Sequence, residues 1–264
     1  MKNDYSIVIT TCDKFSDLWS NNLTLLNTFW PSHNEVFLVS DKENDFGKTL
    51  CPNFYYFHFD YSFRLLKMLE TIQTKYVFLT LDDYLIANTV NENRILEIIK
   101  FMDSNNLSYV RFFNRTKTKG WLDKKRKIHL LPLKKDAYEV NLYPSLWNRK
   151  DLISIITKDE NIWKFEVRLT RRSREKKFKC GWINNKKVFD FVDTIRKGKY
   201  LRPAYKFIKR NNLYLSNREQ RKFKEDFLLA LRTLLSRYLP DKIKRKLKKR
   251  SKKAFFSECS ETDD

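Results

Sequence analysis

The first half of the chain alternates short β-branched or aromatic segments with longer segments of helical periodicity, and this alternation limits the fold more than any other feature. Strands are predicted over 5–11, 35–41, 54–59 and 76–81, and helices over 16–30, 62–73 and 91–105. Nearly continuous apolar strands between helices of this length predict a parallel sheet that is covered on both faces. We therefore expect an α/β, Rossmann-like fold with a mostly parallel sheet.

The second half of the chain is less regular and ends in segments of different character. The pattern predicts strands over 107–113 and 186–193, two helices within 148–173, and an amphipathic helix over 218–239 that Pro240 ends. We expect a main domain over 1–210, an amphipathic helical extension over 211–240, and a basic, then acidic, disordered tail over 241–264.

The charge of the chain predicts an acidic partner. Its 54 Lys and Arg residues outnumber 32 Asp and Glu residues, which gives a formal charge of +22. The phosphates of a small ligand, a nucleic acid and an anionic bilayer all match this charge. Nine of the thirteen residues from 241 to 253 are Lys or Arg and follow the amphipathic segment. This combination predicts a peripheral contact with an anionic membrane surface.

The cysteines and the apolar runs bear on localisation. Cys12, Cys51, Cys180 and Cys259 are scattered without a C-x-x-C pair, so neither a zinc site nor a disulfide framework is indicated. The N-terminal apolar stretch is too short for a signal peptide, and no run has the length of a spanning helix. We therefore expect a cytoplasmic protein that is peripheral on the inner face of the cell membrane.

Polar side chains follow each of the first four predicted strands, at the edge where ligands of open parallel sheets bind. These side chains are Thr10, Thr11 and Asp13, then Ser40 and Asp41, then Asp60, and finally Asp82 and Asp83. The chain has only four glycines, and neither G-x-G-x-x-G nor a P-loop is present. A phosphate ligand would therefore be held by basic side chains and a divalent cation rather than by a glycine-rich loop.

The adjacent carboxylates of "KYVFLTLDDYLI" (75–86) are the predicted cation ligands. Mg²⁺ and Mn²⁺ bind to one or two carboxylates together with substrate phosphates, and Asp82 and Asp83 supply such a pair at the exit of a buried strand. The alternative is a turn in which one carboxylate caps the backbone. Two adjacent charges cost more desolvation free energy than a single cap requires, so we favour the metal site.

Four segments together resemble a known family. "YSIVITTCDKFSDLW", "FLTLDDYLI", "YPSLWNRKDLI" and "NIWKFEVRL" are similar, in order and spacing, to segments of bacterial glycosyltransferases of the GT-A fold, which build capsular polysaccharide or lipopolysaccharide O-chains. The resemblance covers roughly residues 4–210. It implies transfer of a sugar from a nucleotide-diphosphate donor to a glycan or polyprenyl-linked acceptor. Members commonly hold a metal at a D-x-D motif, whereas Asp82 and Asp83 here are adjacent, which leaves metal dependence open.

The resemblance implies roles for residues of the nucleotide side. Thr11 and Asp13 would lie against the base, and Asp41 near the base or ribose, although turn formation explains each equally well. Arg64 and Lys67 lie three residues apart on one predicted helix and could neutralise the diphosphate, or simply be solvated at the surface.

The acceptor side needs a base, since a neutral alcohol attacks poorly. Glu166 lies in an aromatic context that can raise a carboxyl pKa toward a useful value, so we predict that it is the catalytic base. The alternative is a structural ion pair with Arg149, Arg168 or Arg171. Trp147 and Trp163 are predicted to stack on an acceptor sugar, or else to belong to the core.

Two other classes of protein remain open. Basic residues interleaved with Phe and Tyr also suit a nucleic-acid-binding protein, but no RNA- or DNA-binding motif is present and the strand ends carry acids. We therefore expect no nucleic-acid partner. The third class is a non-catalytic scaffold for glycan assembly with a transferase fold, against which Asp82, Asp83 and Glu166 argue.

Overall fold

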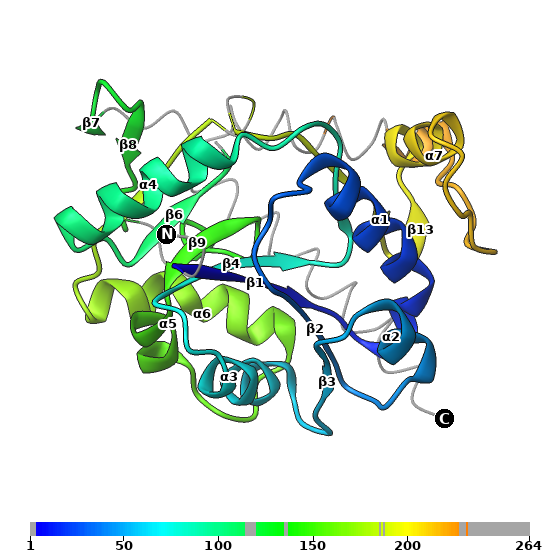
Figure 1. Ribbon diagram of the computed structural model, residues 1–264, viewed down its shortest axis with the longest axis horizontal. Helices are drawn as coiled ribbons and strands as arrows, with labels where there is room; N and C mark the ends of the chain where they lie inside the picture. The colour runs from blue at the N-terminus through cyan, green and yellow to red at the C-terminus, as the bar shows by residue number, and fades with distance from the viewer. Residues whose placement is uncertain are drawn as a thin grey trace.

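The computed structural model in Figure 1 describes residues 4–113, 120–134, 137–184, 186, 188–226 and 231. The strands of its main sheet are β1 (Tyr5–Thr10), β2 (Val36–Ser40), β3 (Phe54–Tyr56), β4 (Tyr76–Leu81), β6 (Tyr109–Arg111), β7 (Trp121–Asp123), β8 (Ile128–Leu130), β9 (Ser145–Asn148) and β10 (Cys180–Trp182). Two small sheets pair β5 (Tyr84–Ile86) with β11 (Phe191–Asp193), and β12 (Ile195–Arg196) with β13 (Lys199–Tyr200).

The nine strands of the main sheet follow the order β3-β2-β1-β4-β9-β6-β10-β8-β7. The first four are parallel, as the alternation of strands and helices predicts. Strand β9 then lies antiparallel between β4 and β6, β10 pairs parallel with β6, and β8 and β7 complete an antiparallel edge. The α/β class is confirmed, and its parallel half brings together the strand ends that carry the acids.

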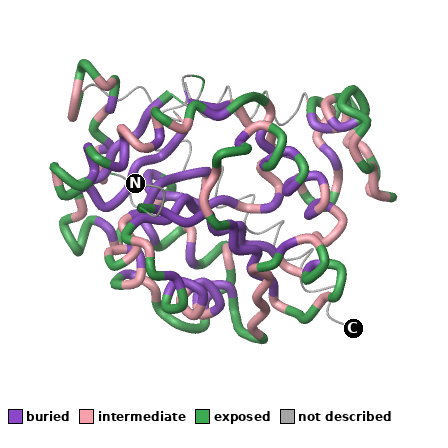
Figure 2. The backbone as a smooth tube through the Cα atoms, in the orientation of Figure 1, coloured by how far each residue is buried: buried purple, intermediate pink, exposed green. Residues whose placement is uncertain are grey.

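Helices cover both faces of the sheet (Figure 1). They are η1 (Asp13–Leu18), a 3₁₀ helix, followed by α1 (Trp19–Phe29), α2 (Asp45–Leu50), α3 (Tyr61–Thr71), α4 (Glu92–Asn105), α5 (Arg149–Ile155), α6 (Ile162–Glu175) and α7 (Arg202–Arg210). Along β1, Ile7 and Ile9 pack with residues of α1 and α4, whereas Val8 packs with residues of α3, α5 and α6. The strands are therefore buried on both faces, as Figure 2 shows for the interior of the molecule.

Asparagines cap the starts of four helices, α2 through Asn44 and three others. The side chains of Asn91, Asn148 and Asn161 accept backbone N–H groups in the first turns of α4, α5 and α6. Each satisfies one or two N–H groups that a helix leaves without an internal partner. The predicted division of 148–173 into two helices is confirmed, and the cap at Asn161 restarts the second helix after the break.

The C-terminal prediction is corrected where the structure describes it. Residues 211–222, predicted as part of the helical extension, are not helical, and Gln220 bridges to Tyr200 of β13. Residues 223–226 are helical, whereas most of the remaining segment to 240 and the whole tail over 241–264 lie outside the described residues. Of the helices that the structure describes, none has the length and apolar character needed to cross a membrane.

Candidate functional site

The carboxyl ends of β1, β2 and β4 bring polar side chains together at one edge of the sheet. The register pairs Thr10 of β1 with Val39 of β2 and with Leu81 of β4. The residues that follow these positions, Thr11 and Asp82 among them, are therefore neighbours although 71 residues separate those two in sequence. This juxtaposition is the one that the sequence predicts.

Asp82 is buried and held in place. Its Oδ2 atom accepts the hydroxyl of Thr11, whose oxygen in turn accepts the indole N–H of Trp19 at 2.7 Å. Its main-chain carbonyl accepts the side-chain amide of Asn22 at 2.9 Å. Burial, reinforced by the carboxylate of Asp17, raises the pKa of Asp82 to about 7, although the Thr11 bond acts in the opposite direction.

Asp83 is the less satisfied member of the pair. It lies in the tight turn between β4 and β5, and within the described part of the chain its buried Oδ1 atom has no hydrogen-bond partner. Burial and the nearby carboxylates of Asp82 and Asp193 raise the pKa of Asp83 well above its usual value, and Arg196 opposes them. A buried carboxylate oxygen without a donor costs free energy, so this atom fits a position that a cation or a ligand would occupy.

Asp82 and Asp83 fit a cation site in which the protein supplies only one or two carboxylate ligands. No group of three or more His, Cys, Asp or Glu side chains in the described residues is arranged to hold a metal. Asp83 has an oxygen available, while one oxygen of Asp82 is bonded to Thr11. Mg²⁺ and Mn²⁺ bound through one or two carboxylates take their other ligands from water and substrate phosphates. The described residues match this requirement, and metal binding remains a prediction.

Asp13 and Asp41 link the loops that follow β1 and β2. The backbone N–H of Asp13 donates to Asp41 Oδ1 at 2.7 Å, and Asn44 Nδ2 donates to Asp13 Oδ1 at 2.7 Å. Asn44 also accepts the N–H of Gly47 at 3.0 Å in the first turn of α2. The structure thus brings together Asp13 and Asp41, the two acidic residues predicted to contact the nucleotide base. The same contacts stabilise the loop before α2.

Gly47 is required where α2 packs on the sheet. A Cβ atom at this position would lie 2.5 Å from the ring of Phe54 and 2.9 Å from that of Trp19. Real Cβ atoms do not approach other atoms so closely, so a larger residue would displace α2. The loop that carries Asp41 and Asn44 therefore depends on this glycine.

The two predicted diphosphate ligands on α3 differ in their surroundings. Arg64 is 6% exposed, and its guanidinium lies 5.9 Å from the ring centroid of Tyr61. In the described structure it forms no ion pair and no side-chain hydrogen bond. A nearly buried cation without an anion is costly, which makes Arg64 a suitable phosphate ligand. Lys67 is half-buried and pairs with Glu70 at 3.0 Å, so the structure does not join it to Arg64.

Tyr61 connects Arg64 to the carboxylates. Its hydroxyl lies 3.2 Å from Thr10 Oγ1, at the end of β1. Burial raises the pKa of Tyr61, Arg64 acts to lower it, and the charges of Glu166 and Asp82 raise it further. The phenol is therefore within electrostatic range of all three predicted site residues.

Glu166 lies on α6, on the side of the site opposite η1. It is half-buried, and its Oε1 atom accepts the N–H of Leu142 at 3.4 Å. The three arginines considered as ion-pair partners bond elsewhere: Arg149 to the carbonyls of Leu69 and Thr74, Arg168 to Glu160, and Arg171 to Glu175. The structure therefore does not support that structural alternative.

An aromatic cluster lies beside Asp83. Tyr84 packs against Tyr143 and Phe191 with centroids 5.3 Å apart in each case, and Phe113 stacks on Tyr143 at 4.9 Å. All four rings are half-buried. Burial, together with the charges of Asp83 and Glu166, raises the pKa of Tyr84 well above its usual value, so this ring is within electrostatic range of the predicted cation ligand and of the predicted base. Sequence reasoning missed it, because its four members come from four separate segments.

The two tryptophans predicted to bind the acceptor have opposite surroundings. Trp147 is fully buried on β9 and packs on Tyr109 with centroids 4.5 Å apart, so it belongs to the core and has no surface to offer a sugar. Trp163 is 74% exposed, on the same helix as Glu166 and one turn before it. Only Trp163 has the exposure that stacking on a sugar requires.

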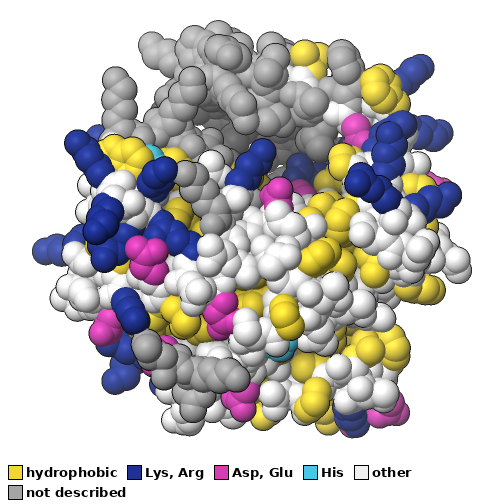
Figure 3. All heavy atoms as spheres, turned by 45° about the horizontal axis from the view of Figure 1, so that its top comes forward, with side chains coloured by type: hydrophobic (Ala, Val, Ile, Leu, Met, Phe, Trp, Pro, Cys, Tyr) yellow, Lys and Arg dark blue, Asp and Glu magenta, His cyan; other side chains and the backbone are white. Residues whose placement is uncertain are grey.

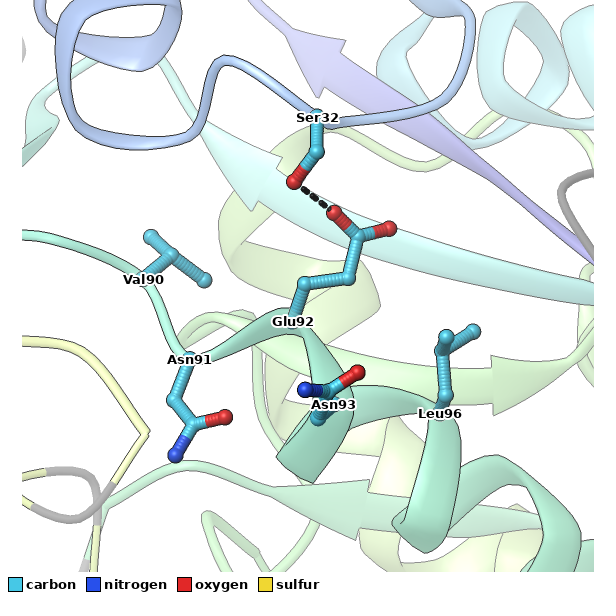
Figure 4. A pocket seen from close by; sticks show the side chains of 6 residues that line it. All are labelled: Ser32, Val90, Asn91, Glu92, Asn93 and Leu96. Carbon is cyan, nitrogen blue, oxygen red and sulfur yellow. Dashed lines mark hydrogen bonds between the residues drawn. The ribbon is translucent and has the colours of Figure 1, made fainter.

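A shallow hollow at the start of α4 is separate from this site. Ser32, Val90, Asn91, Glu92, Asn93 and Leu96 line it, with a volume of about 430 Å³ (Figure 4). Glu92 accepts hydrogen bonds from Ser32, Trp30 and Tyr5. Because Tyr5 begins β1, the hollow is at the opposite edge of the sheet from the strand ends. The Glu92 carboxylate is satisfied by protein donors, which assigns it a structural role.

Basic side chains are prominent on the molecular surface. Figure 3 shows Lys and Arg gathered toward both sides of one face, with hydrophobic and neutral surface between them. The exposed lysines of the β7–β8 turn, Lys124, Lys125 and Lys127, form no ion pair with any described residue. The charged surface of this face is thus predominantly basic, whereas the ends of β1, β2 and β4 carry acidic residues.

Comparison with known proteins gives only distant likenesses. No protein family model and no curated protein matches the sequence. Among solved structures, S. aureus TarS 1-349 in complex with UDP has a TM-score of 0.48 at 12% identity, over 73% of this chain and 60% of that one. The same protein in complex with UDP-GlcNAc has a TM-score of 0.43 at 14% identity, over 75% and 60%.

A third likeness is to the bifunctional IspDF from Campylobacter jejuni, with a TM-score of 0.42 at 13% identity, over 69% of this chain and 49% of that one. The chain thus matches about half to three fifths of the length of these structures. Likenesses at this level carry no conclusion about activity, which is argued from the site itself.

Proposed function

We propose that this protein is a glycosyltransferase that moves a sugar from a nucleotide-diphosphate donor to a glycan or lipid-linked acceptor in bacterial surface polysaccharide synthesis. One observation carries the proposal: the nearly buried guanidinium of Arg64 and the buried, unpartnered oxygen of Asp83 occur at the same edge of the parallel sheet. A cation bound at Asp83 would satisfy its orphan oxygen. A diphosphate that bridges this cation and Arg64 would satisfy the guanidinium.

The donor side is formed by the ends of β1, β2 and β4. Thr11, Asp13 and Asp41 would position the base and ribose, and Arg64 would contact the diphosphate. Asp82 and Asp83 would hold Mn²⁺ or Mg²⁺, and this ion supplies counter-charge to the departing diphosphate when it is bound. Asp82 fixes Thr11 through its hydrogen bond, so it also shapes the loop that follows β1.

The acceptor side is formed by α6 and the aromatic cluster. Glu166 would accept the proton of the acceptor hydroxyl while the acceptor oxygen forms its bond to the anomeric carbon. The bond between that carbon and the phosphate oxygen breaks, and its electron pair leaves with the diphosphate. Trp163 would stack on an acceptor sugar near Glu166.

The basic tail is proposed to locate the enzyme rather than to take part in the reaction. Residues 241–264 lie outside the described residues, and their sequence places basic charges beside an amphipathic segment. Such charges favour an anionic leaflet by about 1 kcal/mol each. Deletion of 241–264 should leave turnover on a soluble acceptor nearly unchanged and release the protein from anionic vesicles, as added salt does. Loss of turnover on the soluble acceptor would contradict this role.

The proposed function is tested by ligand-dependent thermal stability. Unfolding should be measured with UDP, GDP, CDP and dTDP, each with and without Mn²⁺, and with single-stranded oligonucleotides. A ligand present at about 100 times its Kd stabilises the native state by about 2.7 kcal/mol, which gives a measurable shift. A shift with one nucleotide diphosphate supports the proposal. A shift with oligonucleotides alone favours nucleic-acid binding, and binding of a nucleotide sugar without its turnover favours the scaffold.

A further inference from the structure

The segment after α7 crosses back to η1 and binds it. We call residues 213–221 the strap. Arg218 of the strap donates to Asp17 through Nε at 2.7 Å and Nη2 at 2.6 Å, and Nη2 also donates to the carbonyl of Lys14 at 2.8 Å. Its guanidinium carbon lies 4.7 Å from the ring centroid of Phe15. One side chain therefore contacts three residues of η1 from a position about 200 residues further along the chain.

The element that Arg218 binds is poorly stabilised by its own geometry. η1 is a 3₁₀ helix of six residues, its interior residue Phe15 has non-helical angles of φ −111° and ψ 16°, and Cys12 provides no side-chain cap. Phe15 therefore marks a kink that divides η1 into two short turns, and neither turn is long enough to be stable alone. Contacts with other elements help to hold η1. Asp13 contacts Asp41 and Asn44, the side chains of Phe15 and Leu18 pack in an apolar cluster, and Arg218 contacts Asp17.

The strap itself is fixed at several points. The side chain of Asn21 in α1 accepts the N–H of Tyr214 at 3.0 Å and donates to its carbonyl at 2.6 Å. Ser216 lies 2.9 Å from the hydroxyl of Tyr200, and the backbone of Tyr200 exchanges hydrogen bonds with Glu219 and Arg221. The strap is thus tied to α1 and β13, and it can transmit that rigidity to η1.

We propose that Arg218 is a positioning residue for the nucleotide site: by clamping Lys14, Phe15 and Asp17 it holds the start of η1, and with it Thr11 and Asp13, in the geometry that binds the donor. This inference rests on the proposed function. It assigns a role at the donor site to the C-terminal segment up to residue 221. The tail over 241–264, in contrast, is proposed only to bind the enzyme to the membrane surface. Arg218 itself is not assigned a contact with the donor.

The test compares three full-length variants: Arg218→Gln, Arg218→Lys and the control Glu219→Gln. Arg218→Gln removes the clamp, and we expect it to raise the donor KM and the nucleotide Kd about tenfold while kcat and the acceptor KM stay within about twofold. Arg218→Lys keeps the charge and one bond, so it should recover part of the affinity. Glu219→Gln removes only the exposed ion pair of the strap with Lys199, and its nucleotide Kd should match the wild type.

Amide hydrogen exchange supplies a readout that does not depend on the nucleotide. Arg218→Gln should speed exchange in residues 13–18 and leave β1 and β4 unchanged. Unchanged donor affinity in Arg218→Gln, with wild-type nucleotide binding intact, overturns the inference and leaves the proposed function standing. Equal losses in kcat and in both KM values would show a general folding defect, and also overturn it. A wild-type protein that binds no nucleotide overturns both.

Discussion

Neutralising Asp82 should stabilise the ligand-free protein at alkaline pH. Asp82 is 6% exposed, and its pKa is raised from 3.8 to about 7, chiefly by burial. The unfolded chain releases this proton near pH 4, whereas the native state retains it up to about pH 7. Between these values the native state binds more protons than the unfolded state. Stability therefore falls as pH rises through this window, and the loss is complete above the native pKa.

The size of the effect follows from the two pKa values. A difference of about 3 pH units corresponds to a loss of roughly 4 kcal/mol at pH 8, of which roughly a third has already been lost at pH 5. The free energy of unfolding should thus decrease by roughly 3 kcal/mol between pH 5 and pH 8 because of this group. Asp82→Asn retains an oxygen to accept the Thr11 hydroxyl but carries no charge, so it should remove this part of the pH dependence.

Urea unfolding in EDTA at pH 5, 6, 7 and 8 measures the effect for wild type and Asp82→Asn. The difference between the two proteins removes the contributions of the many groups far from the site, and it reports Asp82 together with the effect of its charge on the pKa of Asp83. Asp60→Asn is a matched control, because Asp60 also follows a strand but is exposed and makes no side-chain cap bond. The reasoning is refuted if Asp82→Asn is less stable than wild type at pH 8, or if both proteins lose the same free energy between pH 5 and pH 8.

Three further predictions address the reaction and the fold. Glu166→Gln should reduce kcat about 10²- to 10⁴-fold with nucleotide Kd nearly unchanged, whereas Asp83→Asn should weaken nucleotide binding in Mn²⁺, and titration calorimetry with turnover assays separates the two phenotypes. Trp163→Ala should raise the acceptor KM about fivefold, which corresponds to about 1 kcal/mol, and leave the melting temperature unchanged, since the ring is 74% exposed. A loss of stability would show that the ring contributes to folding instead. Glu160→Gln should destabilise the protein by about 3 to 5 kcal/mol in urea unfolding, because Glu160 is 2% exposed and Arg172 bonds both its oxygens; a change below about 1 kcal/mol would contradict this reading.

Local sequence signals predict the parts of the fold that depend on local structure. The strand over 76–81 is observed with those limits, and the two helices within 148–173 occur on either side of the predicted break. Strands β9 and β10 were not predicted, because each has only three or four residues and gains its structure from pairing with distant strands. The helical periodicity of 218–239 misled the prediction at 218–222, where the bonds of Arg218 and the backbone pairing with Tyr200 outweigh local preference.

The site residues can likewise be recognised from local sequence, whereas their contacts depend on distant segments. A strand followed by Asp82 and Asp83 is visible in the sequence, and so is the basic residue Arg64. Which of these side chains is satisfied is not visible, because the partners of Asp82 come from β1 and α1, and the lack of a partner for Asp83 depends on how β5 pairs with β11. The exposure of Trp163 and the burial of Trp147 likewise depend on packing between elements that no local pattern specifies.

Asp82 and Asp83 have different roles at the exit of the buried strand β4. Asp82 joins β4 to the loop after β1 through Thr11 and to α1 through Asn22, so it contributes to the local structure even though its charge is costly. Asp83 has no comparable bond for its buried Oδ1 atom within the described residues, and burial and the charges of Asp82 and Asp193 disfavour its ionised form. A buried carboxylate oxygen that costs stability and has no partner in the described protein is expected where ligand binding needs it. Asp83, rather than Asp82, is thus the member of the pair whose presence the fold alone does not explain.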